Sequence, residues 1–409
     1  MPVTDFTLRV ETETFYQNVM YLSLALIIAG VGFLKANIST IVGALYGFGD
    51  SRRDSGFTIF YMGINLGAFL SSVLCGYLGI AWGWKYGFGL AGIGMLLGLT
   101  VFLRFQHWLE GKAEPPNPAL LRKKVFGPLT VEQLCYLSGL AVITVSMLVV
   151  MNAHLVEENY VGLLGLAILV VLIGYAFVSC RGEERDRMLA SIYFILAQIP
   201  FWALFEQAGS SLTLFTDRLV DRTIFGLSVP TPVFQALNAM YIVIFGPVMA
   251  WLWVALARRK LNPSAPVKFA LGVAMAGMGF LALVAGMKMS GANGMTAVFY
   301  IFLIYWIHTI GELMVSPVGM SALTKLAPAR AVGMTMGAWF LYSGLGNYLS
   351  GVIAQTTGAE TIGGQLIDVV AAKATYADVY TQVGYLSLAV AVVMLALSPL
   401  IRKMMHGAD

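Results

Sequence analysis

Residues 18–45 read NVMYLSLALIIAGVGFLKANISTIVGAL, and Lys35 is the only charged residue in this stretch. The core of a lipid bilayer requires about 20 consecutive apolar residues per helix, so the stretch is long enough to cross a membrane. A charged side chain near the centre of such a helix costs about 2.5–3.5 kcal/mol on insertion scales. The stretch therefore predicts a membrane helix that carries one energetically costly cation.

The composition of the whole chain supports the same interpretation. Of its 409 residues, 58% are apolar and 11% are charged, whereas a soluble domain is about 45–50% apolar and about 25% charged. The mean hydropathy is +0.79. This composition excludes an aqueous enzyme, a nucleic-acid-binding protein or a disordered protein as a description of the whole chain. We predict an all-α integral membrane protein embedded in a lipid bilayer.

Eleven segments have the length and apolar character of membrane helices. None shows the alternating period of a membrane β-strand, so all are predicted to be helical. The predicted spans are 18–45, 55–80, 84–105, 130–152, 159–180, 187–214, 232–257, 268–289, 296–321, 332–356 and 379–401.

Basic residues alternate between the two sets of connections. Of the 25 Lys and Arg residues, eighteen lie in one set and six in the other, while Lys35 lies within a span. Cytoplasmic loops carry the excess of Lys and Arg in membrane proteins. The C-terminus is therefore predicted to be cytoplasmic and the N-terminus extracytoplasmic.

The spacing of the spans predicts three parts. Residues 1–108 form a partial N-terminal bundle of three helices, 109–182 form a cytoplasmic linker and a membrane hairpin, and 183–409 form a bundle of six helices. If two six-helix halves flank an inserted hairpin, three helices are missing from the front. We therefore expect an N-terminally truncated chain. The alternative is a genuine eleven-span protein.

Three ionisable residues lie deep in apolar runs, namely Lys35, Glu206 and Glu312. Two interpretations are open: a static ion pair that holds helices together, or a pathway for substrate or protons. One cation and two anions leave one carboxylate unpaired. A buried carboxylate without a cationic partner can take up and release a proton, which favours the pathway.

Aromatic residues stand one helical turn before two polar ones. Trp202 precedes Glu206 by four residues, and Trp339 precedes Ser343 by the same spacing. Residues four apart share a helix face, so each pair could place an aromatic wall beside a polar group. Such aromatic residues also serve in packing or at the membrane interface.

Two asparagines interrupt other apolar runs. Asn65 lies in FYMGINLGAF and Asn238 in FQALNAM. Each could orient an amide or an ammonium group, and each could equally bridge two helices.

Small residues and prolines predict how the helices pack and bend. Gly272–Ala276 and Gly333–Gly337 have the spacing that lets two membrane helices approach closely. Pro200, Pro247 and Pro317 fall inside predicted spans and should bend or interrupt them.

No catalytic pattern supports an enzyme. The four histidines form no metal-binding spacing, and there is no Ser/His/Asp set and no phosphate-binding loop. His308 stands one turn before Glu312 and could pair with it or serve as a core histidine. We expect no enzymatic activity, no metal and no cofactor.

Several motifs together resemble the proton-dependent oligopeptide transporters, the peptide branch of the major facilitator superfamily. The FYxGIN stretch at 60–65 is the signature of that family. The similar segments, in chain order, are GFLKANIST (32–40), SRRDSGFTIFYMGINLGAFLSSVLCGYLG (51–79), WGWKYGFGLAGIGMLLGL (82–99), FWALFEQAGSSLTLFTDR (201–218), FQALNAMYIVIFGPVMAWLW (234–253), GELMVSPVGMSALTKLAP (311–328) and MGAWFLYSGLGNYLSG (336–351).

The resemblance implies a major facilitator fold. Bacterial members have fourteen helices, in two six-helix bundles with an inserted hairpin. About eleven are then present here: three of the N-terminal bundle, the two of the hairpin and six of the C-terminal bundle. The family's first helix carries an ExxER motif for proton coupling, and this chain has no such helix.

The resemblance also implies roles for individual residues. Lys35 would bind the peptide carboxylate and take part in proton coupling. Glu206 and Asn238 would bind the peptide amino terminus. Glu312 would pair with Lys35 at the cytoplasmic gate, with Lys35, Glu206 and Glu312 as the proton-coupling set. The remaining predicted substrate-binding residues are Asn65, which would hold the peptide backbone, Trp339, Ser343, Trp202 and Gln235.

The resemblance finally implies an activity: proton-coupled symport of di- and tripeptides across a bacterial inner membrane by alternating access. Protons would be the coupling ion, short peptides the partners, and the monomer the functional unit. One alternative is transport of another small zwitterion or anion. The other is an inactive, truncated membrane protein.

Overall fold

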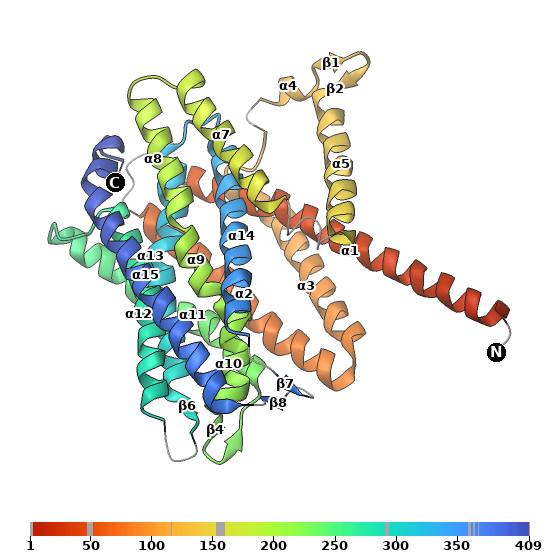
Figure 1. Cartoon of the computed structure of the whole chain (residues 1–409). Coiled ribbons are helices and arrows are strands. Elements are labelled where there is room, and N and C mark those ends of the chain that lie inside the picture. Colours follow the sequence, from red (N-terminus) through yellow and green to blue (C-terminus); the bar gives the residue numbers. More distant parts are fainter. Residues whose placement is uncertain are drawn as a thin grey trace.

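The computed structural model describes residues 3–46, 52–115, 117–152, 160–290, 294–358, 361–362, 365–366 and 368–408 (Figure 1). Helices dominate, and the strands form four short two-stranded pairs. Three pairs are antiparallel, β1–β2, β4–β5 and β7–β8, and β3 pairs with β6 in parallel. All four lie in connections between long helices.

Three long helices begin the chain: α1 (Val3–Ala44), α2 (Arg53–Trp82) and α3 (Trp84–Phe105). Helix α1 begins well before the predicted span at residue 18, and its N-terminal part extends away from the other helices (Figure 1). Gly83 joins α2 to α3 with φ of 107°. Only glycine adopts this backbone conformation readily, so α3 can turn back and pack against α2.

The predicted linker and hairpin follow. The linker holds the 3-10 helix η1 (Gln106–Leu109), α4 (Pro118–Leu121), β1 (Lys124–Phe126) and β2 (Leu129–Thr130). The two predicted membrane helices are α5 (Val131–Met151) and α7 (Val161–Ser179). They pack against different partners: α5 against α1, and α7 against α8 and α14. Figure 1 shows α5 standing apart from the main group of helices.

The rest of the chain forms the main helical group. Its first part holds α8 (Glu183–Ala197), α9 (Ile199–Phe205), the 3-10 helix η2 (Glu206–Gly209), α10 (Ser211–Leu219), β3 (Val220–Asp221), β4 (Thr223–Ile224) and β5 (Leu227–Ser228). Its second part holds α11 (Thr231–Arg258), α12 (Ala265–Lys288), β6 (Thr296–Ala297), α13 (Phe299–Leu326), α14 (Val332–Thr356), β7 (Thr361–Ile362), β8 (Gln365–Leu366) and α15 (Val369–Met404).

Ten helical segments of the described residues are long and apolar enough to cross a membrane. They coincide with ten of the eleven predicted spans. The eleventh, 332–356, is the helix α14, but it is not among the ten. Glycine and polar residues are frequent in α14, which packs against α7, α8, α9 and α13. Its contacts are therefore largely with protein.

Glycines let α12, α13 and α15 approach closely. A Cβ atom added to Gly272 would lie 2.8 Å from the carbonyl oxygen of Gly311, and one added to Gly277 would lie 2.7 Å from that of Gly384. The packing predicted for Gly272–Ala276 is confirmed. The prediction for Gly333–Gly337 is wrong, because a Cβ atom at either glycine would meet no described atom within 4 Å.

The prolines differ in their effect. The predicted span 187–214 is interrupted between α8 and α9, next to Pro200, and again at η2. Pro247 and Pro317 instead lie within the continuous helices α11 and α13. The predicted interruption is confirmed for Pro200 alone.

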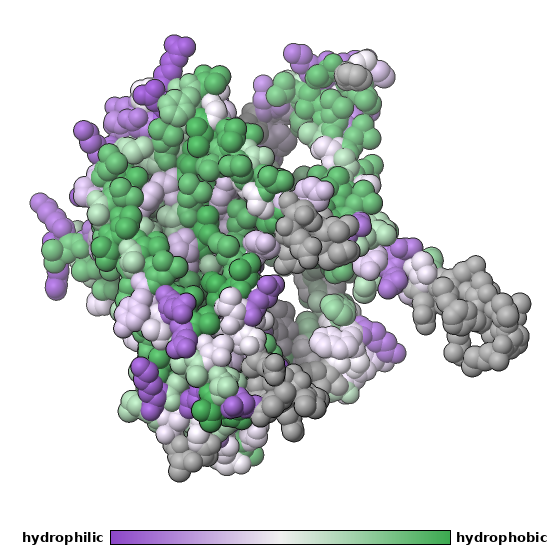
Figure 2. Space-filling view, viewed as in Figure 1, coloured by the Kyte–Doolittle hydropathy of each residue, from purple (hydrophilic) through white to green (hydrophobic). Residues whose placement is uncertain are grey.

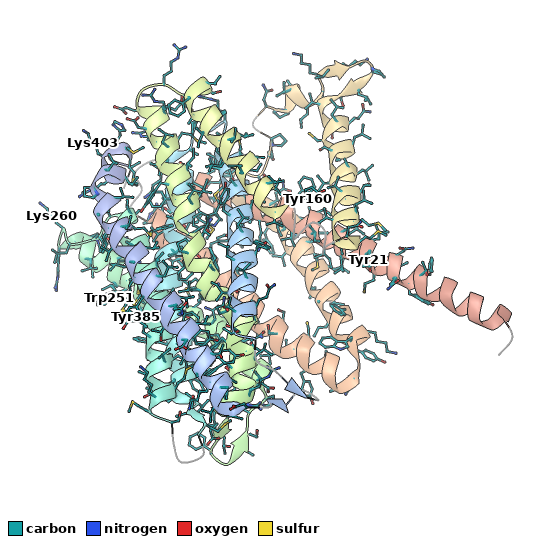
Figure 3. All side chains as sticks on the ribbon, viewed as in Figure 1. Tyr21, Tyr160, Trp251, Lys260, Tyr385 and Lys403 are labelled. Atoms are coloured by element: carbon teal, nitrogen blue, oxygen red, sulfur yellow. The ribbon has the colours of Figure 1, made fainter. Side chains whose placement is uncertain are left out.

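Apolar side chains cover much of the outer surface (Figure 2). Trp251 on α11 and Tyr385 on α15 are among the large side chains exposed there (Figure 3). An exposed apolar surface of this extent is expected for helices that face lipid. The buried core lies mainly between residues 172 and 408.

The connections between the long helices lie at two opposite ends of the molecule. In Figure 1, α4, β1, β2 and the C-terminus lie toward the upper end, whereas β4, β6, β7 and β8 lie toward the lower end. The upper end holds connections with the predicted excess of Lys and Arg, and Lys403 projects there from the edge of the molecule (Figure 3). The chain is thus a multi-pass membrane protein with one basic end.

Candidate functional site

A cavity of about 350 Å³ lies where α1 and α2 meet α9, η2, α13 and α14. Six of the eight predicted substrate-binding residues line it: Lys35, Asn65, Trp202, Glu206, Trp339 and Ser343. Residues up to 308 positions apart in the chain therefore meet at one site, and the structure places most of the predicted site together.

Two side chains of opposite charge line this cavity, one from an N-terminal helix and one from the C-terminal helical group. Lys35 comes from α1, and its Nζ atom lies 5.5 Å from the centre of the Phe340 ring. Glu206 begins η2 on the other side. No ion pair joins these two side chains among the described residues. The cavity therefore presents a separate cation and a separate anion, as binding of a zwitterion requires.

The interrupted helix explains how Glu206 reaches the cavity. Helix α9 ends at Phe205, and the tighter turn η2 begins at Glu206. Trp202, one turn earlier, lines the same cavity. The prediction that Trp202 and Glu206 share a face is therefore confirmed, and the same holds for Trp339 and Ser343 on α14.

A buried glutamine that the sequence analysis did not identify connects three of these lining residues. The Gln198 side chain donates a hydrogen bond from Nε2 to the Trp339 carbonyl oxygen, at 2.8 Å. Its Oε1 atom accepts bonds from Nε1 of Trp202, at 2.9 Å, and from Oγ of Ser343, at 3.2 Å. Gln198 itself is fully buried and lies behind the cavity wall.

Glu312 has different partners from those predicted. The Tyr61 hydroxyl group donates a hydrogen bond to Oε1, and Nδ2 of Asn238 donates to Oε2 at 2.7 Å. No ion pair joins Glu312 to Lys35 in the part of the chain that the structure describes. The predicted pair is absent because both carboxylate oxygens face α2 and α11.

Asn238 and Gln235, which were also predicted to bind substrate, lie outside this cavity. The Asn238 amide donates hydrogen bonds from Nδ2 to the Glu312 carboxylate and to Oγ1 of Thr309, which lies 3.2 Å away. Gln235 is exposed, and its Nε2 donates to Oγ1 of Thr213 at 3.1 Å. Neither residue lines the cavity. Asn238 instead supports the buried carboxylate next to it.

Several further lining residues were missed, among them Tyr61, Phe340 and Ser316. Tyr61 stands four residues before Asn65, so the helical spacing could have placed it on the same face. Phe340 follows Trp339 directly. Ser316 stands four residues after Glu312, and it is buried in the cavity wall.

His308 is a core histidine. Its Nε2 atom lies 3.0 Å from the carbonyl oxygen of Ala276, and its ring packs against those of Phe280 and Phe205. The described residues show no pairing of His308 with Glu312, because the imidazole faces α12 instead.

Comparison with known proteins identifies the family. The family described as PTR2, the POT family, matches residues 6–369. The chain belongs to the POT family. This membership confirms the resemblance drawn from the motifs, including FYMGIN at 60–65, and it agrees with the all-α membrane fold.

Two relatives and one solved structure illustrate the similarity. The uncharacterized transporter YclF of Bacillus subtilis is 36% identical over 95% of this chain and 75% of that protein. The peptide transporter YePEPT of Yersinia enterocolitica is 33% identical over 85% of this chain and 70% of that protein. A crystal structure of the peptide transporter POT in complex with sulfate is 31% identical, with a TM-score of 0.66, over 96% of this chain and 80% of that one.

Proposed function

We propose that this POT-family protein is a proton-coupled symporter of di- and tripeptides that works by alternating access. The observation that carries the proposal is the cavity lined by Lys35 and Glu206, a cation and an anion from different parts of the chain. Similarity to named peptide transporters supports the same substrate class.

The charge pattern fits a short peptide. The ends of an extended dipeptide or tripeptide lie roughly 5–10 Å apart, at about 3.3–3.6 Å per residue. Lys35 binds the carboxylate and Glu206 binds the ammonium group. The Asn65 amide donates to the Tyr61 carbonyl oxygen at 2.9 Å, which leaves its own oxygen to accept a bond from a peptide N–H group.

The walls of the cavity allow varied side chains. Trp202, Trp339 and Phe340 supply apolar surface, and Ser316 and Ser343 supply hydroxyl groups. Pockets with large aromatic walls and few polar groups accept ligands of different shape. Many peptide side chains are therefore accepted, with affinities that depend on how each one fits these walls.

Glu312 is the proton site in this proposal. An ionised carboxylate accepts hydrogen bonds from both Tyr61 and Asn238, one on each oxygen. A protonated carboxylic acid carries a donor on one oxygen and no charge, so the bond with Tyr61 becomes a weaker, neutral hydrogen bond. Tyr61 is on α2 and Glu312 is on α13. Protonation of Glu312 therefore weakens a bond between an N-terminal helix and the C-terminal helical group.

Lys35 completes the coupling. When Glu312 is released from Tyr61, its carboxylate can turn toward Lys35 in another access state. Burial of an unpaired charge is costly, so each of these groups requires a partner in any state that buries it. The pair between Lys35 and Glu312 stays a prediction for that state.

The proposal includes location and assembly. The protein lies in a bacterial inner membrane with its C-terminus in the cytoplasm, which the basic end of the molecule supports. It works as a monomer, uses protons as its coupling ion and needs no other cofactor.

Uptake of labelled dialanine into proteoliposomes tests the function. An inward proton gradient should drive accumulation of the peptide above its external concentration, and a protonophore should abolish that accumulation. Competition by excess unlabelled dialanine, but not by alanine, separates peptides from other small zwitterions. Failure to bind or accumulate any short peptide would refute the proposal.

A further inference from the structure

Gln198 lies at the first interruption of the helical segment that carries Glu206. It is the single residue between α8 and α9 and stands two positions before Pro200. Proline has no N–H group, so it cannot bond the carbonyl oxygen of Leu196 four positions earlier. The Gln198 backbone N–H group bonds that oxygen instead. The interruption thus fixes the position of the Gln198 backbone, and with it the point from which the side chain extends.

The Gln198 side chain makes three hydrogen bonds, and all three go to residues that line the cavity. One amide both donates to α14 and accepts from α9 and α14. A glutamate would lack the donor and an apolar residue would lack every bond. The chemistry of this position therefore requires an uncharged amide.

Gln198 accepts a hydrogen bond from the single polar group of the Trp202 ring. The indole has one hydrogen-bond donor, Nε1–H, and Gln198 accepts it. The base of the same side chain is held by close packing, because a Cβ atom added to Gly346 would lie 2.5 Å from that of Trp202. With both ends fixed, the ring has one orientation in the cavity wall.

The same wall lies next to the anion of the site. Trp202 and Glu206 are one helical turn apart and line the cavity together. If Glu206 binds the peptide ammonium group, the side chain of the first peptide residue lies beside Trp202. The orientation of that ring then determines which first residues fit.

We propose that Gln198 is a positioning residue that orients Trp202 and Ser343 and thereby sets the preference for the side chain of the first peptide residue. This inference rests on the proposed peptide transport. Gln198 touches no substrate, because it lies behind the residues that do.

Gln207 provides a matched control on the same segment. It is fully buried as well, and it bonds α14 through Ser350, whose carbonyl oxygen lies 3.0 Å from Nε2. Its Oε1 atom accepts a bond from Ser211 at 2.5 Å. None of these partners lines the cavity. Loss of either amide should therefore reduce stability, but only loss of Gln198 should change the site.

The test compares Gln198→Met with Gln207→Met, which keep the length of the side chain and remove its hydrogen bonds. Affinities of the detergent-solubilised 409-residue protein for Phe-Ala, Ala-Phe and Ala-Ala are measured by calorimetry. In Gln198→Met the affinity for Phe-Ala should fall by about tenfold, the equivalent of one or two lost hydrogen bonds. The affinity for Ala-Ala should change by less than threefold, and Ala-Phe should follow Ala-Ala.

Each outcome has a definite meaning. Gln207→Met should lower the melting temperature and leave the ratio of Phe-Ala to Ala-Ala affinity unchanged. If Gln198→Met leaves this ratio at the wild-type value, Gln198 has only a structural role and the inference is overturned. If Gln198→Met does not fold, Gln198→Asn keeps an amide that is one methylene shorter, and the ratio should fall in the same direction. A wild-type protein that binds none of the three peptides would instead overturn the proposed function itself.

Discussion

The hydroxyl group of Tyr61 on α2 donates a hydrogen bond to Oε1 of Glu312 on α13, and the two residues are 251 positions apart in the chain. The bond joins an N-terminal helix to the C-terminal helical group. Asn238 holds the other carboxylate oxygen. The buried acid is therefore connected to the cavity through Tyr61, which lines it.

Tyr61→Phe removes one donor from Glu312 and keeps the ring. A hydrogen bond to a charged group contributes about 1.5–3 kcal/mol, so the link between α2 and α13 should weaken. Proton-driven accumulation of dialanine should fall at least tenfold, with binding affinity within about threefold of the wild-type value. Tyr241→Phe is the control, because among the described residues the hydroxyl group of Tyr241 bonds a single backbone carbonyl oxygen, that of Phe302, at 3.4 Å. Equal accumulation in both variants would contradict a role of the Tyr61 bond in coupling.

Glu206→Gln keeps the shape of the side chain and removes the anion that faces the peptide ammonium group. Loss of a desolvated charge interaction costs about 2–5 kcal/mol, so dipeptide affinity should fall at least tenfold. An N-acetylated dipeptide has no ammonium group and should bind the wild type and the variant equally weakly. Unchanged affinity for the free dipeptide would mean that Glu206 is structural.

Lys35→Ala should separate driven transport from exchange. The lysine is needed to pair with Glu312 during the proton cycle, whereas exchange of peptide down its own gradient depends less on that step. Driven uptake should be abolished, and counterflow should survive in part. The two assays are run side by side on the same proteoliposomes. Intact proton-driven accumulation in Lys35→Ala would require the coupling role to be abandoned.

Asn238 and Gln235 should differ in their effects, although both were predicted to bind substrate. Asn238→Leu leaves Oε2 of Glu312 without its 2.7 Å donor, and an unsatisfied buried acceptor costs about 1–3 kcal/mol. Thermal unfolding should therefore show a lower melting temperature. Gln235→Leu removes only an exposed bond to Thr213, and its dipeptide affinity should stay within about twofold of the wild-type value. A large loss of affinity in Gln235→Leu would support its predicted role in substrate binding.

Gly277→Ala should destabilise the contact between α12 and α15. The added Cβ atom would lie 2.7 Å from the carbonyl oxygen of Gly384, and overpacking costs about 1–3 kcal/mol. Gly333→Ala is the control, because its Cβ atom would meet no described atom within 4 Å. The melting temperature should fall in the first variant and stay level or rise in the second. Equal melting temperatures would show that α12 and α15 can separate without cost.

The sequence predicted the site only where a local signal was present. Lys35 and Glu206 were found because a charge in an apolar run is costly enough to need a function. Trp202 and Ser343 were found because residues four apart share a helix face. Tyr61 carries only its spacing of four from Asn65. Gln198 carries no such signal, since the importance of a glutamine in a membrane helix depends on what faces it.

The sequence by itself determined the membrane helices and the identity of the charged residues, because the length and apolar character of each span are local properties. Only the tertiary structure decided the partners. Glu312 bonds Tyr61 and Asn238 rather than Lys35, and Gln198 bonds α14. A hydrogen bond depends on the distance and orientation of two groups, and these follow from how separate helices pack.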